Sequence, residues 1–284
     1  MHKAARLADV SRCATHDEPV PLADPCDTSV LIEGAPAARL ASKAACWQHG
    51  ADLVGSGAAM VLIGGLPAAR IGDGILDKGV IVGPGANQVL IGGPTFAVPS
   101  VITIEGDEAY RSKVIRDLYF ISTTRSGQEL FARMEKSGQP IIIMINPGDP
   151  DKNNTCAEPP SIYRQGVPCP SMIQYNPDYQ TLSRGPNGEV IRISPQEALL
   201  HESIHALAYA EGTVPKYGGD PELKSMNEYE AQAIGAGSHE GARPTENSFR
   251  SDLGLNPPRA QHTRVEPDTV EEMPPPQNFR PGKP

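Results

Sequence analysis

Aromatic side chains are scarce in this 284-residue chain, and its first hundred residues contain only Trp47 and Phe96. All eight tyrosines and the remaining phenylalanines lie further on. Small and β-branched side chains make a weak core, because each buried methylene contributes only about 0.8 kcal/mol. We therefore expect two domains with differently built cores, and we expect a bound metal to stabilise the first.

An excess of positive charge and long apolar runs are also missing. The formal net charge is −9, whereas nucleic-acid binding depends on clustered Lys and Arg that neutralise phosphates. No run reaches the roughly 20 apolar residues that span a bilayer, and the N-terminus lacks the apolar stretch of a signal peptide. We therefore expect a protein made in the cytoplasm, with no nucleic-acid partner and no membrane span.

Three short segments repeat in the first hundred residues. They read Val-Leu-Ile-Glu-Gly at 30–34 and Val-Leu-Ile-Gly-Gly at 61–65 and 89–93, and Pro-Ala-Ala-Arg follows the first two at 36–39 and 67–70. Repeats of about 30 residues cannot bury a face alone and must pack against one another. The pattern predicts a three-sided, all-β domain over residues 1–95.

Two Cys-x-x-His tetrapeptides occupy equivalent places in the first two repeats. Cys13 and His16 form one pair, and Cys46 and His49 form the other. Because the pairs are in repeat register, we expect their loops to meet at one end of the domain. Four sulfur and nitrogen ligands describe a closed, structural zinc site.

This stretch resembles the PAAR-repeat proteins, which are named for the tetrapeptides found here at 36–39 and 67–70. In that family the repeats form a zinc-stabilised β cone that caps VgrG, the trimeric spike protein of the bacterial type VI secretion system. The cone is fired into another cell with whatever it carries. The resemblance implies VgrG as a partner and secretion into target cells through this system.

The pattern changes after residue 95. Residues 96–104 are expected to form a linker, and apolar spacing predicts helices over 107–120 and 126–136. Strands are expected at 141–145, 171–175 and 190–193, so the domain over 105–260 is predicted to be α+β. Proline and charge are dense at the C-terminus, and we expect 261–284 to be a disordered tail.

A third motif carries the catalytic chemistry. Ser194, Pro195 and Glu197 are typical of a helix start, and the helix should run to Gly212. It places His201 and His205 on one face, where both imidazoles can reach one zinc ion. Zinc lowers the pKa of its water toward about 7, and a carboxylate one step around the helix, Glu202, is placed to remove the proton.

A third ligand is needed for this catalytic zinc. Residues 227–233 are expected to form a second helix with two acidic side chains, Glu228 and Glu230. Each is followed three places on by an alanine that permits close helix packing. Spacing alone does not choose between them.

The second domain resembles the NleD-like family of secreted bacterial effector metalloproteases. The matching segments are His-Glu-Ser-Ile-His at 201–205, residues 227–235, and Thr-Glu-Asn-Ser-Phe-Arg at 245–250. The resemblance covers 105–260 and implies a zincin-like metallopeptidase. Alignment on Gly235 favours Glu230 as the third ligand, with Glu228 as the alternative. Candidate oxyanion stabilisers are Tyr209, Tyr229 and Arg243.

Together these features predict a type VI secretion effector whose zinc endopeptidase cleaves a protein in the recipient cell. An immunity protein is a further candidate partner. One alternative is a structural spike protein with a catalytically silent extension, and another is a zinc amidase acting on the cell wall. The thiols of Cys156 and Cys169 are expected either to form a disulfide or to remain reduced.

Overall fold

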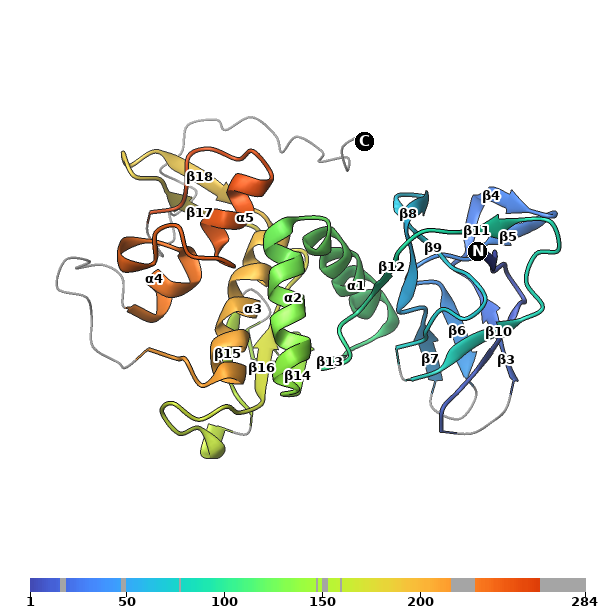
Figure 1. Cartoon of the computed structure of the whole chain (residues 1–284), viewed down its shortest axis with the longest axis horizontal. Helices are drawn as coiled ribbons and strands as arrows, with labels where there is room; N and C mark the ends of the chain where they lie inside the picture. Colours follow the sequence, from blue (N-terminus) through green and yellow to red (C-terminus); the bar gives the residue numbers. More distant parts are fainter. Residues whose placement is uncertain are drawn as a thin grey trace. The chain divides into compact units, whose positions relative to one another are not determined.

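The computed structural model describes residues 1–15, 19–46, 50–76, 78–146, 148–149, 153–158, 160–215 and 228–260. The chain divides into two compact units (Figure 1). Unit 1 comprises Met1–Val98 with Gly106–Tyr119, and unit 2 comprises Pro99–Glu105 with the chain from Phe120 onward. Within the described ranges, no helix is long and apolar enough to cross a membrane.

Unit 1 contains short antiparallel strands. Its largest sheet has the order β10-β2-β3-β6-β7, and the smaller sheets are β12-β8-β9, β4-β5 and β1-β11. The strands are β1 (His2–Lys3), β2 (Val10–Arg12), β3 (Pro19–Ala23), β4 (Asp27–Ile32), β5 (Ala35–Ala37), β6 (Lys43–Cys46), β7 (Gly50–Leu53), β8 (Ser56–Ile63), β9 (Leu66–Ala68), β10 (Val80–Gly83), β11 (Leu90–Ile91) and β12 (Thr95–Ala97).

The three repeats meet in a closed ring of backbone hydrogen bonds. Ala5 donates to Ala69 at 2.9 Å, Ala69 donates to Ala38 at 3.0 Å, and Ala38 donates to Ala5 at 3.0 Å. All three alanines are fully buried. Each of these alanines is the second alanine of an Ala-Ala-Arg segment, at 4–6, 37–39 and 68–70. The backbone segments of the three repeats meet there, which explains why each repeat has a small side chain at this position.

A second layer of the core also takes one residue from each repeat. Ile32, Ile63 and Ile91 are buried in one hydrophobic cluster. The leucine before each of them is exposed. The repeated Val-Leu-Ile segment thus supplies a core contact and an outward apolar side chain in each repeat.

Unit 2 is an α+β fold around a four-stranded sheet of order β13-β14-β16-β15. The first three strands are parallel, and β15 is antiparallel at one edge. Helix α3 packs on β15 and β16 and lies beside α2 (Figure 1). The strands of the unit are β13 (Ile102–Ile104), β14 (Ile141–Met144), β15 (Asn154–Ala157), β16 (Ser171–Gln174), β17 (Thr181–Arg184) and β18 (Val190–Ile193).

Five α-helices are described, together with two short 3-10 turns, η1 (Pro160–Ile162) and η2 (Gly237–His239). The helices are α1 (Glu108–Ser122), α2 (Arg125–Ser137), α3 (Pro195–Glu211), α4 (Glu228–Ile234) and α5 (Glu246–Asp252). The helices and strands expected between 107 and 212 agree with these bounds to within two residues. Residues 261–284, expected to be disordered, lie outside the described residues.

The expected linker at 96–104 differs from the structure. Most of β12 lies in this range and pairs with β8 of unit 1, and β13 pairs with β14 of unit 2. Ile102 and Ile104 are buried on β13, because alternate side chains of a strand face the core. The flanking prolines favoured a linker, but three residues of alternating pattern were enough for a strand inside a sheet.

Unit 1 also differs from the expected all-β domain, because most of α1 belongs to it. The Tyr119 ring packs edge-on against Phe96, with 5.3 Å between ring centroids. Arg111 donates to Asp52 at 2.9 Å. The helix supplies aromatic side chains that the repeats themselves lack.

Gly127→Ala should destabilise unit 2 by about 1–3 kcal/mol, since overpacking displaces neighbouring groups. A Cβ at Gly127 would overlap the carbonyl oxygen of Ile121, which is backbone and cannot swing aside. Urea unfolding measures the change, with Gly148→Ala as the matched control. The nearest atom to a Cβ at Gly148 would be the Asn146 side-chain oxygen at 3.6 Å. Equal stability of the two variants would contradict the prediction.

Candidate metal centre

Helix α3 begins and ends as its sequence predicts. The Ser194 hydroxyl accepts from the Glu197 backbone at 3.2 Å, and the Glu197 carboxylate accepts from the Ser194 backbone at 2.9 Å. Gly212 closes the helix with a left-handed backbone, φ 68°, a conformation that glycine adopts without strain. The helix is buried for most of its length, so His201 and His205 are carried in the interior with only 3% of each exposed.

Three side chains converge on one point. The Nε2 atoms of His201 and His205 are 3.1 Å apart. Glu230 of α4 brings its Oε2 to 3.1 Å from His201 Nε2 and 3.5 Å from His205 Nε2. Among the residues that the structure describes, this is the one group of His, Cys, Asp or Glu placed to hold a metal ion.

The spacing of these atoms fits a tetrahedral metal. Ligands that each bind zinc at about 2.0–2.1 Å with tetrahedral angles are about 3.3–3.4 Å apart. The three distances, between 3.1 and 3.5 Å, bracket that value. Two imidazoles and one carboxylate also leave a fourth position for water or substrate, as catalytic sites require.

Glu228, the alternative third ligand, has other partners. Its Oε1 contacts His239 Nε2 and accepts a hydrogen bond from Ser238 at 3.1 Å. On a helix, residues two apart point in different directions. The structure therefore brings Glu230, and not Glu228, to the two imidazoles.

Burial and hydrogen bonding oppose one another at these groups. Burial lowers the pKa of His201, but hydrogen bonds to Glu230 and Glu246 outweigh it and raise the pKa to about 9. At His205 burial dominates and lowers the pKa. Burial would raise the pKa of Glu230, yet its bonds to both imidazoles hold that pKa well below the ordinary value. The metal-free site therefore pairs a protonated His201 with a charged Glu230.

The apparent zinc affinity of the metal-free protein should rise with pH up to about 9 and then level off. Zinc binds only the neutral imidazole and must displace the His201 proton whenever the pH is below that residue's pKa of about 9. Each unit below this value should weaken binding about tenfold. Competition with a chelator of known pH dependence measures the affinity, with His201→Ala as the control for zinc bound elsewhere. A constant affinity from pH 6 to 9 would contradict the prediction.

A buried charge pair orients His201 from behind. Its Nδ1 lies 2.9 Å from Glu246 Oε2, and Arg259 donates to the same oxygen at 2.7 Å. Glu246 is fully buried. Burial would raise its pKa, but Arg259 and His201 lower it to about 2, so the carboxylate is charged. A carboxylate in this position selects the tautomer of a ligand histidine and raises its basicity.

Sequence reasoning missed the roles of Glu246 and Arg259. Both lie in or beside matched segments, but Glu246 follows an N-cap threonine, Thr245. An acidic residue at that place is typical of an exposed helix start. Only its complete burial distinguishes it from an ordinary first-turn carboxylate.

Glu202 is held by a residue that the sequence did not single out. Thr155 of β15 places its hydroxyl 2.8 Å from Glu202 Oε2 and 2.9 Å from the Glu202 backbone oxygen. Glu202 is 8% exposed and supplies none of the three converging ligand atoms. It lies directly after His201 on α3, outside the group of three ligand atoms.

The three candidate oxyanion stabilisers lie in different surroundings. Tyr229 stacks on the His205 ring, with centroids 3.8 Å apart and planes 12° apart. Tyr209 contacts Tyr229 edge-on at 6.4 Å. Arg243 donates to Asp252 at 2.9 Å and to Glu129 at 3.1 Å, so its charge is engaged by α2 and α5. The structure brings the two tyrosines, and not Arg243, toward the histidines.

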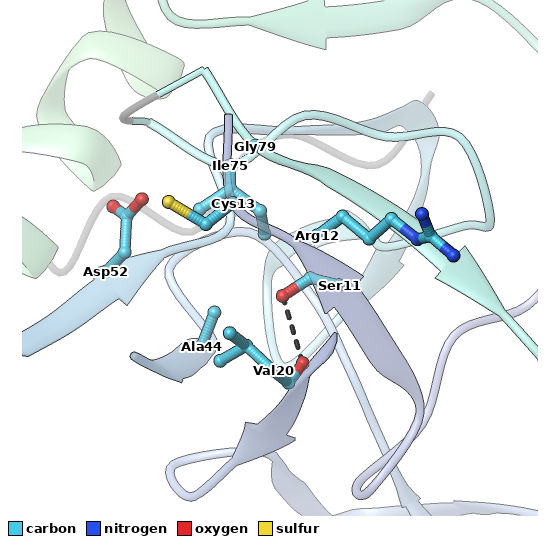
Figure 2. A pocket seen from close by; sticks show the side chains of 8 residues that line it. All are labelled: Ser11, Arg12, Cys13, Val20, Ala44, Asp52, Ile75 and Gly79. Atoms are coloured by element: carbon cyan, nitrogen blue, oxygen red, sulfur yellow. Dashed lines mark hydrogen bonds between the residues drawn. The ribbon is translucent and has the colours of Figure 1, made fainter. Parts of the chain in front are cut away.

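The predicted structural zinc site is described only in part, because His16 and His49 lie outside the described residues. Strands β2 and β6 are both antiparallel to β3, so Cys13, just after β2, and Cys46, at the end of β6, lie at the same end of the sheet. Cys13 and Asp52 line one pocket there, with their sulfur and carboxylate on the same side of it (Figure 2).

Cys156 and Cys169 are free thiols in the structure. Burial raises the pKa of each, so both are protonated near neutral pH. Of the two expectations for this pair, the structure agrees with the reduced thiols.

Comparison with known proteins gives one family. The model of the Peptidase M91 family, described as "Effector protein", matches residues 98–261. No curated protein matches the chain. Solved structures that are similar to this chain at low identity include two of a botulinum neurotoxin protease. The catalytic domain of Clostridium botulinum neurotoxin serotype F is 13% identical with a TM-score of 0.38, over 51% of this chain and 49% of that one. The light chain of the same serotype is 14% identical with a TM-score of 0.34, over 45% of each chain. This chain thus spans about half the length of those proteins.

Proposed function

Because the chain belongs to the Peptidase M91 family of effector proteins, we propose that this metallopeptidase is a zinc-dependent endopeptidase that cleaves a protein inside a recipient cell. The observation that carries the proposal is the convergence of His201, His205 and Glu230 on one point with tetrahedral spacing. A bound zinc ion would supply a Lewis acid and lower the pKa of water to about 7.

The protein's own residues have separate roles in the proposed reaction. His201, His205 and Glu230 hold the metal, and Glu246 keeps His201 in the required tautomer. Glu202 removes a proton from the attacking water and passes it to the leaving amine. Thr155 keeps the Glu202 carboxylate in place through the hydrogen bond to Oε2.

Two substrates distinguish the peptidase from a cell-wall amidase. The purified zinc-loaded chain is incubated with a recipient-cell lysate and, separately, with peptidoglycan. We expect new protein N-termini in the lysate that are missing when a chelator is present, and no release of peptides from peptidoglycan. If only peptidoglycan were cleaved, the protein would be a cell-wall amidase and the proposed endopeptidase activity would be wrong. No product in either arm would favour a catalytically silent extension.

The delivery route is a second part of the proposal. We infer that unit 1 caps the trimeric spike protein VgrG of a type VI secretion system and carries unit 2 into the target cell. Support comes from the threefold ring of alanines and from the exposed leucine in each repeat, Leu31 at 62%, Leu62 at 42% and Leu90 at 54%. Three equivalent apolar side chains suit a partner that is itself threefold.

Co-purification of the full chain with VgrG tests this route. Replacing Leu31, Leu62 and Leu90 together with Asp should abolish the complex, because charges are then buried against an apolar surface. Val167→Asp serves as the control, since Val167 is an exposed valine of unit 2, 50% accessible. Binding that survives the triple change would remove VgrG as the partner of this surface.

A structural zinc at Cys13, His16, Cys46 and His49 belongs to the same proposal. It would stabilise a unit whose core consists mainly of alanine, valine, leucine and isoleucine. Metal analysis of the full chain should then find two zinc ions, and one in the Cys13→Ser/Cys46→Ser variant. If the target is bacterial, an immunity protein that binds unit 2 is also expected, because producing cells would need protection.

A further inference from the structure

Tyr229 lies flat against the ring of His205. The ring centroids are 3.8 Å apart and the planes differ by 12°, whereas the His201 ring meets His205 edge-on, with 4.7 Å between centroids and planes at 88°. Tyr229 directly precedes Glu230 on α4. Consecutive residues of one helix therefore supply a ligand carboxylate and a ring that covers the face of a ligand imidazole.

The two imidazoles are held in different ways. His201 has a carboxylate at its Nδ1, at 2.9 Å. The Nδ1 of His205 is buried and has no hydrogen-bond partner among the described residues. A ligand histidine ordinarily donates its second ring N–H to an acceptor, and this bond sets the ring orientation. Something else must limit rotation of the His205 ring.

We propose that Tyr229 is a positioning residue for the metal site, whose ring fixes the orientation of His205 by stacking, in place of the hydrogen bond that orients His201. The proposal rests on the proposed function, in which His205 binds zinc. Parallel, offset rings attract each other and also keep water from the covered face. Rotation of His205 away from the metal would break this contact.

The aromatic ring of Tyr229, and not its hydroxyl, orients His205 in this proposal. The contact with His205 is made by the stacked ring, with centroids 3.8 Å apart. A role in orienting a metal ligand distinguishes Tyr229 from the oxyanion stabiliser that the sequence suggested.

Zinc affinity of the full chain tests the proposal without any substrate. Affinity is measured by chelator competition, and Co²⁺ absorption in the visible range reports the geometry of the bound site. Tyr229→Leu should bind zinc at least about tenfold more weakly, the loss expected when support for a ligand is removed, and its Co²⁺ bands should change. Tyr229→Phe keeps the ring and should bind within about threefold of the unaltered chain.

Tyr163→Leu is the matched control. Tyr163 belongs to the same group of aromatic rings, edge-on to Tyr209 at 5.5 Å, but it does not stack on His205. This variant should bind zinc as the unaltered chain does. The His205→Ala variant measures how much zinc binds elsewhere in the chain.

The outcomes separate the two proposals. If the unaltered chain binds no more zinc than His205→Ala, the proposed metal site itself fails. If the site binds zinc but Tyr229→Leu binds equally well with an unchanged Co²⁺ spectrum, only the role of Tyr229 is overturned. Should Tyr229→Leu not fold, Tyr229→Phe decides, because a tenfold loss there would assign the role to the hydroxyl and contradict the proposal.

Discussion

Glu202→Gln should lower the rate of peptide cleavage by about 10²–10⁴-fold, the usual contribution of a general acid–base group, while zinc binding stays unchanged. Glu202 donates none of the three ligand atoms, so its loss leaves the metal group intact. Glutamine has nearly the same shape and can still accept from Thr155, but it cannot take a proton from water. Turnover of a protein cleaved in the lysate experiment measures the rate, and metal analysis measures the zinc.

Glu211→Gln is a suitable control for this experiment. It changes a carboxylate of the same helix whose side chain is 26% exposed and pairs with Arg133 at the surface. Exposed ion pairs contribute only about 0–1 kcal/mol, so both rate and zinc content should be unchanged. A Glu202→Gln protein that keeps a tenth or more of the activity would remove Glu202 from the proposed reaction.

Glu246→Ala should have the largest effect on stability, about 3–5 kcal/mol in the free energy of unfolding of the metal-free chain. Arg259 is only 6% exposed, and removing the Glu246 carboxylate leaves its buried positive charge without compensation. Urea unfolding at pH 7 measures the loss. Glu211→Ala, which removes a surface carboxylate, should cost less than about 1 kcal/mol.

The charge itself is tested by a second change and by pH. Glu246→Ala/Arg259→Met removes both charges and should recover most of the lost stability, because a buried apolar pair no longer needs compensation. The depressed pKa of Glu246 means that its charge stabilises the fold fully above its ordinary pKa of 4.5 and progressively less as pH falls toward 2. The difference between the unaltered chain and Glu246→Ala should therefore shrink in that acid range. A double variant no more stable than Glu246→Ala would contradict this account.

The repeats and the catalytic helix were predictable because both depend on local spacing. Val-Leu-Ile recurs at a nearly constant interval, which predicted the repeated units, and the structure shows that its isoleucines are core residues. The start of α3 was set by the Ser194 cap and its end by Gly212. These features involve neighbours within a few positions, where helical and strand periodicity dictates which side chains share a face.

The boundary between the two units was harder to predict from the sequence. Strands β12 and β13 each have three residues, which is too short for periodicity to distinguish a strand from a connection. Helix α1 was predicted from the spacing of its apolar residues, but that spacing does not indicate which unit the helix packs against. Its position against β8 and β12 depends on contacts such as Tyr119 with Phe96 and with the Ala59 backbone.

By itself, the sequence determined which residues are candidates for the chemistry, since His201, Glu202 and His205 lie on one turn of a capped helix. It also limited the candidate third ligand to Glu228 or Glu230. Only the tertiary structure decided that Glu230 reaches the histidines, that Glu246 and Arg259 support them, and that Thr155 holds Glu202. These contacts join residues 29, 45 and 47 positions apart, and over such separations the packing of α4, α5 and β15 around α3, not spacing along the chain, sets which atoms meet.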